Sequence, residues 1–259
     1  DEALATLDEM LSTLQISEKD FLKDNMHVPV YRTLYLDKLL EENEGIYEDR
    51  DAKFKDLVKG FKTVKDAEFK APESLSKIMR NYQKTGFKWI STLDKYGFGG
   101  ILCDDMGLGK TLQTISFLYK HYLDASCEEA APTIVVCPAS LVYNWQDEFG
   151  KFAPEINVCP VVGSIPEREE IIANANLYQV LITSYDLLKR DVALYENVEF
   201  YYEIIDEAQY IKNHTTAAAK AVKVLRSTHR LALTGTPIEN RLSELWSIFD
   251  FLMPGFLYK

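Results

Sequence analysis

The spacing of apolar residues divides the chain into two parts that meet near Pro72. Before Pro72, apolar residues recur at helical spacing in two stretches, residues 4–14 and 54–64. Such spacing places apolar side chains on one face of an amphipathic helix. The stretch at 41–51 is acidic and interrupted by a glycine, which indicates a surface connection. We therefore predict that residues 1–72 form a mainly helical segment, which either packs against a neighbouring domain or has a binding function of its own.

Beyond Pro72 the pattern changes to short β-rich runs that alternate with helical stretches. The six strand-like runs are Ile101–Cys103, Thr133–Cys137, Ile156–Val162, Val180–Tyr185, Tyr202–Asp206 and Arg230–Thr234. Strands that alternate with helices form a mostly parallel sheet, because right-handed crossovers place helices on both of its faces. We therefore predict an α/β domain over residues 73–259, with ligands beyond the carboxyl ends of the strands.

The composition is typical of a folded globular protein. The chain has 259 residues, of which 47% are hydrophobic and 27% are charged, so it can bury a substantial core. No apolar run approaches the roughly 20 residues that span a membrane, and the N-terminus lacks the pattern of a signal peptide. The net charge of −11 argues against tight binding of nucleic acid by the whole surface, but it does not exclude a local basic groove.

The cysteines and histidines bear on the cellular compartment. The chain has no C-x-x-C pair, and three of its cysteines lie in strand-like apolar runs; the four are Cys103, Cys127, Cys137 and Cys159. We expect buried free thiols in a reducing compartment rather than a disulfide or a metal site. The four histidines are scattered, which argues against a zinc site. A cytoplasmic location is therefore predicted.

The first candidate site is a glycine-containing loop between a strand and a helix. Gly107 and Gly109 allow the backbone to curl so that successive N–H groups point at phosphate oxygens, near the positive end of the helix dipole. Lys110 would reach the β- and γ-phosphates of ATP, and the Thr111 hydroxyl would ligate Mg²⁺. The strict pattern G-x-x-x-x-G-K-[ST] has glycine where this chain has Asp104, so a chance helix entry is the alternative. The predicted ATP-binding residues of the loop are Asp104, Asp105, Met106, Gly107, Leu108, Gly109, Lys110 and Thr111.

Two later strands end in polar residues that fit the same chemistry. One apolar strand runs into adjacent carboxylates, Asp206 and Glu207. Asp206 can hold Mg²⁺ through a water, and Glu207 can orient and deprotonate the water that attacks the γ-phosphate. The alternative, a solvated acidic turn, fits poorly because the preceding residues are apolar. The other strand ends in a small polar turn, Thr234, Gly235 and Thr236, whose hydroxyls either sense the γ-phosphate or cap the next helix.

Taken in order, these motifs resemble the first lobe of the Swi/Snf family within helicase superfamily two. The segments that carry the resemblance are Arg80–Gln83 (adenine motif), Asp104–Gln113 (motif I), Cys137–Leu141 with Asn144–Trp145 (motif Ia), Ile182–Tyr185 (motif Ib), Asp206–Gln209 (motif II, a DEAQ box) and Leu233–Asn240 with Glu244–Trp246 (motif III). The strings D-D-M-G-L-G-K-T and L-T-G-T-P-I-E-N are highly specific to this family. The resemblance covers residues 73–259 and implies a RecA-like P-loop NTPase fold, a parallel sheet flanked by helices. Residues 1–72 look like the segment that precedes the motor in bacterial members.

The resemblance implies roles for further residues. Lys110, Asp206 and Glu207 would be the catalytic set. Gln83 would pair with the adenine edge of ATP, and Gln209 would bridge motif II to motif III. The residues that would face DNA phosphates are Pro138, Ser140, Leu141, Asn144, Trp145, Thr183 and Ser184. For Trp145, core packing is the alternative.

The resemblance also implies the activity, an ATP-dependent translocase on double-stranded DNA that uses Mg²⁺ with ATP. Its second lobe, with the arginine fingers and the rest of the DNA clamp, is not part of residues 1–259, so we expect this lobe alone to hydrolyse ATP weakly. A nucleotide-gated nucleic-acid-binding module without turnover is the alternative, and the presence of Glu207 favours the enzyme. We expect a bacterial protein that is cytoplasmic and associated with the nucleoid.

Overall fold

The computed structural model describes residues 30–42, 50–124, 131–238 and 241–257. The chain divides into two compact units, Asp1–Asp66 and Ala67–Lys259. The helical pattern predicted at residues 4–14 and most of the acidic connection at 41–51 lie outside the described residues. Within the described ranges, no helix is both long and apolar enough to cross a membrane.

The described part of the first unit is helical, as predicted. It contains η1 (Val30–Arg32), α3 (Thr33–Glu42), α4 (Ala52–Lys62) and η2 (Val64–Asp66). Helix α4 begins after Asp51, whose carboxylate accepts a hydrogen bond of 2.7 Å from the N–H of Phe54. The buried Asp37 of α3 pairs with Arg50 and with Lys62, and the second of these contacts measures 2.8 Å. The two helices are therefore joined by a shared carboxylate as well as by apolar packing.

The second unit contains a six-stranded sheet with the order β1-β6-β5-β2-β4-β3, and all five pairings between strands are parallel. The strands are β1 (Gly100–Cys103), β2 (Thr133–Cys137), β3 (Val158–Pro160), β4 (Val180–Ser184), β5 (Glu199–Ile205) and β6 (Arg226–Thr234). Every residue of β2 and β4 is buried, which is typical of parallel strands covered on both faces. The predicted parallel α/β fold is confirmed.

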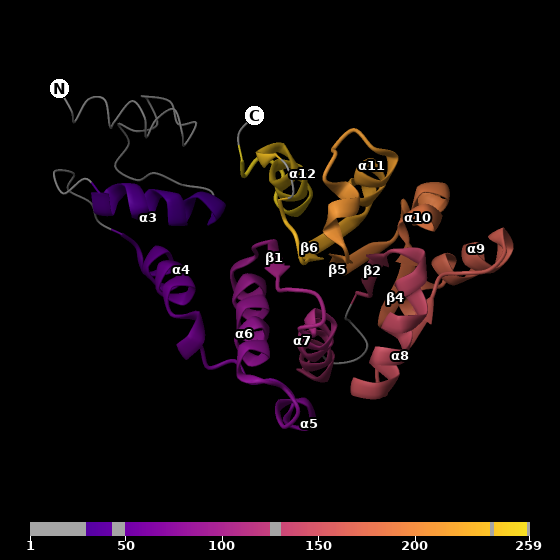
Figure 1. Cartoon of the computed structure of the whole chain (residues 1–259), viewed down its shortest axis with the longest axis horizontal. Coiled ribbons are helices and arrows are strands. Elements are labelled where there is room, and N and C mark those ends of the chain that lie inside the picture. The colour runs from indigo at the N-terminus through magenta and orange to yellow at the C-terminus, as the bar shows by residue number, and fades with distance from the viewer. Residues whose placement is uncertain (1–29, 43–49, 125–130, 239–240, 258–259) are drawn as a thin grey trace. The chain divides into compact units, whose positions relative to one another are not determined.

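Helices cover both faces of this sheet, with α6, α7 and α8 on one side and α10, α11 and α12 on the other (Figure 1). The helices and short turns of the unit are α5 (Glu73–Ser76), α6 (Asn81–Tyr96), α7 (Lys110–Asp124), η3 (Ala139–Leu141), α8 (Val142–Phe152), α9 (Ile165–Ala173), η4 (Ala175–Leu177), α10 (Tyr185–Asp191), η5 (Val192–Tyr195), η6 (Ala208–Ile211), α11 (Ala217–Val224) and α12 (Leu242–Leu252). One core cluster joins the apolar side chains of β2, β4, β5 and β6 to those of α10, α11 and α12.

Several details differ from the sequence prediction. Strand β3 is shorter than expected, since it pairs only with β4 and ends at Pro160, which has no N–H to donate. Tyr185 begins α10 instead of ending β4, because Ser184 caps the helix. Of the three described cysteines, all of which are free, Cys137 is buried but Cys103 is exposed, since β1 ends there; Cys127 lies outside the described residues.

Candidate active site

Three predicted motifs follow three neighbouring strands. In the sheet, β6 lies between β1 and β5, and their carboxyl ends are in register, with Cys103 opposite Thr234 and Ile205 opposite Ala232. The phosphate loop follows β1, the acidic pair follows β5, and the Thr-Gly-Thr turn follows β6. The fold therefore brings these three segments to one edge of the sheet, where parallel α/β proteins bind their ligands.

The phosphate loop has the backbone shape that its glycines predict. Gly107 and Gly109 have φ values of 80° and 77°, in the left-handed region that glycine enters without strain. Helix α7 begins at Lys110, and Thr111 lies in its first turn. The Lys110 ammonium donates to the backbone oxygens of Asp104 at 2.7 Å and of Asp105 at 3.2 Å. The lysine is therefore folded over the loop, at the positive end of the helix dipole.

Two glutamines anchor the loop, one from α6 and one from α7. Nε2 of Gln83 donates to the Leu108 oxygen at 3.0 Å, while Oε1 accepts from the N–H of Arg80 at 2.9 Å. The buried Gln113 of α7 donates through Nε2 to the Asp104 carboxylate at 2.9 Å. Asp104, which departs from the strict phosphate-loop pattern, is thereby tied to the helix that follows. The adenine contact of Gln83 stays a prediction, since one N–H and one lone pair of its amide are left for it.

The acidic pair is held in a defined geometry. Burial raises the pKa of the Asp206 carboxyl, and the hydrogen bonds from Trp145 and from the Glu207 N–H act in the opposite direction. These bonds measure 2.9 Å from the Trp145 indole to Oδ2 and 2.8 Å from the Glu207 N–H to Oδ1. Glu207 has a φ of 51°, the only positive value among the described non-glycine residues. A strained, left-handed residue of this kind costs about 1–2 kcal/mol and is typical of functional sites.

A line of hydrogen bonds connects the acidic pair to the turn after β6. Gln209 donates through Nε2 to Glu207 Oε2 at 2.7 Å, and its Oε1 accepts from the Thr234 hydroxyl at 3.0 Å. The Thr234 hydroxyl in turn accepts from the N–H of Thr236 at 3.1 Å. A side chain at Gly235 would approach Met106 and the Asp104 oxygen at ordinary contact distances of 3.5 and 3.7 Å. The turn therefore lies beside the phosphate loop while it is bonded to Gln209.

The phosphate loop, the acidic pair and the turn after β6 all lie in a segment that matches a known domain. Residues 82–259 match the SNF2-related domain, which is more than half of the chain. The chain belongs to the SNF2-related family. Residues 1–72 of this family member match a second domain, described as bacterial SNF2 helicase associated.

Relatives of this SNF2-related protein include ATPases of solved structure. The TATA-binding protein-associated factor MOT1 of Saccharomyces cerevisiae is 43% identical over 198 residues, 73% of this chain and 11% of that protein. An uncharacterised ATP-dependent helicase of Mycoplasma genitalium is 45% identical over 179 residues, 69% of this chain and 17% of that protein. The Sulfolobus solfataricus SWI2/SNF2 ATPase core in complex with dsDNA superposes with a TM-score of 0.61 and 45% identity, over 68% of this chain and 36% of that one. The chain thus spans less than a fifth of the length of these curated relatives, and its fold is that of the SWI2/SNF2 ATPase core.

The residues predicted to face DNA separate into two groups. Ser140 and Asn144 are exposed, and Pro138 and Leu141 are half-buried. The other three, Trp145, Thr183 and Ser184, are at most 2% exposed. For Trp145 this burial fits the core-packing alternative, and contact of the seven residues with DNA phosphates stays a prediction. Trp145 points inward with Val142 and Phe149, the buried stripe of α8. Thr183 and Ser184 end the fully buried strand β4, and Ser184 accepts from the N–H of Leu187 at 3.2 Å.

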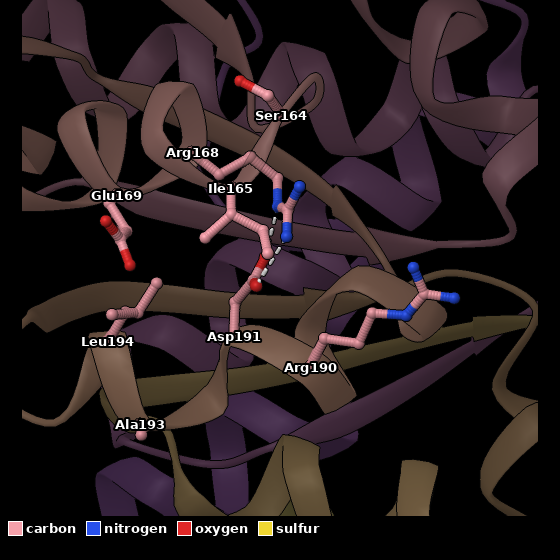
Figure 2. Close-up of a pocket in the computed structure, with 8 residues that line it drawn as sticks. All are labelled: Ser164, Ile165, Arg168, Glu169, Arg190, Asp191, Ala193 and Leu194. Carbon is pink, nitrogen blue, oxygen red and sulfur yellow. Dashed lines mark hydrogen bonds and ion pairs between the residues drawn. The ribbon is translucent and has the colours of Figure 1, made fainter.

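A pocket of about 380 Å³ lies elsewhere, between α9, α10 and η5. Figure 2 shows Arg168 and Asp191 joined in its wall, while the side chain of Arg190 extends away from them. Arg168 binds both oxygens of Asp191, through Nε at 2.6 Å and Nη2 at 2.8 Å, and both side chains are buried. None of the predicted nucleotide-site residues lines this pocket, and its buried charges neutralise each other.

Proposed function

We propose that this chain is the ATP-binding and ATP-hydrolysing lobe of an ATP-dependent translocase that acts on double-stranded DNA. One observation carries the proposal: Glu207, Gln209 and Thr234 form a continuous hydrogen-bonded line from the acidic pair to the turn beside the phosphate loop. Such a line connects the group suited to activate water with a turn suited to report the state of the γ-phosphate.

The residues of the loop and of the acidic pair divide the chemistry between them. Lys110 would leave the loop oxygens and donate to the β- and γ-phosphates, because a charged acceptor binds an ammonium more strongly than a carbonyl does. Glu207 would orient a water and accept its proton as the water oxygen bonds to the γ-phosphorus and the bond to ADP breaks. Gln83 would bind the adenine edge, which favours ATP over GTP.

The donor set fits Mg²⁺, which binds oxygen ligands and usually keeps several waters beside one or two protein groups and the substrate phosphates. Thr111 lies in the first turn of α7 and Asp206 at the end of β5, so a hydroxyl and a carboxylate are available. In the described part of the chain, no cluster of three or more His, Cys, Asp or Glu could hold a metal without such phosphates. Bound there, Mg²⁺ would neutralise charge on the phosphates and polarise them.

Duplex DNA is the proposed partner. Support comes from the structural relative solved with dsDNA and from the exposed polar side chains of Ser140, in η3 just before α8, and Asn144, in the first turn of α8. Hydroxyl and amide groups at a helix start bind backbone phosphates without net charge. We further propose that a second lobe supplies the remaining DNA contacts and an arginine for the transition state, that residues 1–72 form a separate domain, and that the protein acts at the bacterial nucleoid in the cytoplasm.

The test is Glu207→Gln in the full-length protein. Turnover should fall on the order of 10²–10⁴-fold through loss of a general base, while the affinity for a fluorescent ATP analogue stays close to that of the wild type. Glu199→Gln is the matched control, since Glu199 is exposed at the amino end of β5, the strand whose carboxyl end precedes the acidic pair. Near-normal hydrolysis by Glu207→Gln would refute the assignment of the base. A wild-type protein that binds ATP but shows no turnover with duplex DNA would favour a nucleotide-gated binding module instead.

A further inference from the structure

Asp206 receives hydrogen bonds from Trp145, one of the predicted DNA-facing residues, and from Tyr185, which directly follows two others. The Trp145 indole of α8 donates to the Asp206 carboxylate at 2.9 Å, and the Tyr185 hydroxyl of α10 donates to the Asp206 backbone oxygen at 2.8 Å. Both aromatic side chains are buried, with exposed fractions of 2% and 3%. We propose that Trp145 and Tyr185 are positioning residues, which fix Asp206 and connect the surface of α8 and of η6 to the metal-binding carboxylate. The proposal rests on the nucleotide site described above.

The two donors act on different atoms and so constrain different motions. An indole N–H only donates and a carboxylate only accepts, so the Trp145 bond fixes the rotation of the carboxylate. The Tyr185 bond holds the peptide that follows Asp206, next to the strained Glu207. The Trp145 bond to Oδ2 and the bond from the Glu207 N–H to Oδ1 occupy one acceptor site on each carboxylate oxygen. The remaining lone pairs stay available for a metal-bound water.

Each positioning residue is next to an exposed part of the surface. Trp145 directly follows the exposed Asn144 in α8. Tyr185 is stacked on Tyr210, with ring centroids 5.0 Å apart and planes 3° apart. Tyr210 is 52% exposed, and its N–H donates to the Glu207 oxygen at 3.0 Å. A ligand that shifts either surface therefore moves a donor of Asp206, with no need for the buried side chains to touch it.

The test compares Trp145→Phe and Tyr185→Phe with the wild type in the full-length protein, since each variant keeps a ring and removes one donor. Binding of a fluorescent ATP analogue is titrated with Mg²⁺ and with EDTA, and duplex DNA binding is followed by fluorescence anisotropy. Removal of a group that orients a metal ligand costs roughly 10–100-fold in metal affinity or activity. We expect the Mg²⁺-dependent affinity to fall by about this factor for Trp145→Phe, and less for Tyr185→Phe, with the EDTA and DNA affinities unchanged. Tyr178→Phe, which removes a hydroxyl outside the site, should change none of them.

Other outcomes would overturn the proposal. A loss of DNA affinity with normal Mg²⁺ dependence would mean that the two residues contact DNA. An equal loss of nucleotide affinity with Mg²⁺ and with EDTA would reduce them to packing residues. If Trp145→Phe does not fold, benzothienylalanine at position 145 keeps the indole shape without the N–H and gives the same readout. A wild type without DNA-stimulated turnover would refute the translocase but leave the Mg²⁺ comparison intact, so the two failures are distinguishable.

Discussion

Alanine substitutions at three glycines separate the backbone shape of the phosphate loop from its anchoring. Gly107 and Gly109 share a left-handed φ, but an added Cβ at Gly107 would meet nothing within 4 Å. At Gly109 the Cβ would lie 2.5 Å from Nε2 of Gln83, the atom that donates to the Leu108 oxygen. Gly150 lies in α8 with ordinary helical φ and nothing near its Cβ, so it provides a control without either effect.

The magnitudes follow from these environments. A left-handed alanine costs about 1–2 kcal/mol, so Gly107→Ala should weaken ATP binding roughly tenfold if the loop relaxes when empty and must be restored on binding. Gly109→Ala adds the displacement of the flexible Gln83 amide and the loss of its hydrogen bond, about 1 kcal/mol more. We therefore expect a loss on the order of 10² for that variant. Gly150→Ala should leave binding unchanged and stabilise the fold by about 0.5–1 kcal/mol.

Titration of a fluorescent ATP analogue measures the affinities, and urea unfolding measures the stabilities. The decisive comparison repeats Gly109→Ala in a Gln83→Ala background, where the added methyl group no longer meets the amide. Relative to Gln83→Ala alone, the added Gly109→Ala change should weaken ATP binding only as much as Gly107→Ala weakens it in the wild type, because only the cost of the left-handed backbone is left. A Gly109→Ala variant that binds as well as Gly107→Ala, or one whose loss is the same in the Gln83→Ala background, would refute this explanation of the loop.

Two further predictions concern buried charges. Asp191→Ala should lower the free energy of unfolding by about 3–5 kcal/mol, because it leaves the buried Arg168 unpaired. Asp186→Ala, which breaks an exposed ion pair, should lower it by less than about 1 kcal/mol. Urea unfolding measures both, and equal losses for the two variants would contradict the argument. Burial raises the pKa of Glu203 from 4.5 to about 8, against the opposing effect of Arg230. Between these values the folded protein keeps a proton that the unfolded chain has released, so stability falls as pH rises. Glu203→Gln should flatten this slope between pH 5 and 8, and an unchanged slope would exclude Glu203 as its source.

The parallel sheet was predictable because its strands are short apolar runs separated by helical stretches. The predicted strand bounds were least accurate where pairing with a neighbouring strand decides how far a strand extends. The polar residues Glu199 and Arg226 lie opposite each other and extend β5 and β6 at their amino ends, an effect that depends on a neighbour distant in sequence. Strand β3 is shorter than its apolar run predicts, because it pairs with only one neighbouring strand.

In the site, too, short continuous motifs were predictable from the sequence, whereas contacts between residues far apart in the sequence were not. The glycines, Lys110 and the acidic pair were found because each motif is short and continuous. The sequence does not identify the anchors of these motifs, since Gln113 stands out only as part of motif I, and for Trp145 both a DNA contact and core packing are open. The helical spacing of Val142, Trp145 and Phe149 could have indicated a buried tryptophan. Its partner, Asp206, is 61 positions away, and only the fold brings the two together.

The anchors also explain which part of the site is free to respond to ATP. Gln83 and Gln113 fix the two ends of the loop, and Gln209 fixes Glu207 relative to Thr234. These amide contacts hold the loop to α6 and α7, and the acidic pair to the turn after β6, before any ligand arrives. Lys110 is different, because its partners are two backbone oxygens of the loop itself. Exchanging these neutral acceptors for a charged phosphate is favourable and requires no movement of the anchors, so the lysine side chain is the group whose position the nucleotide should change first.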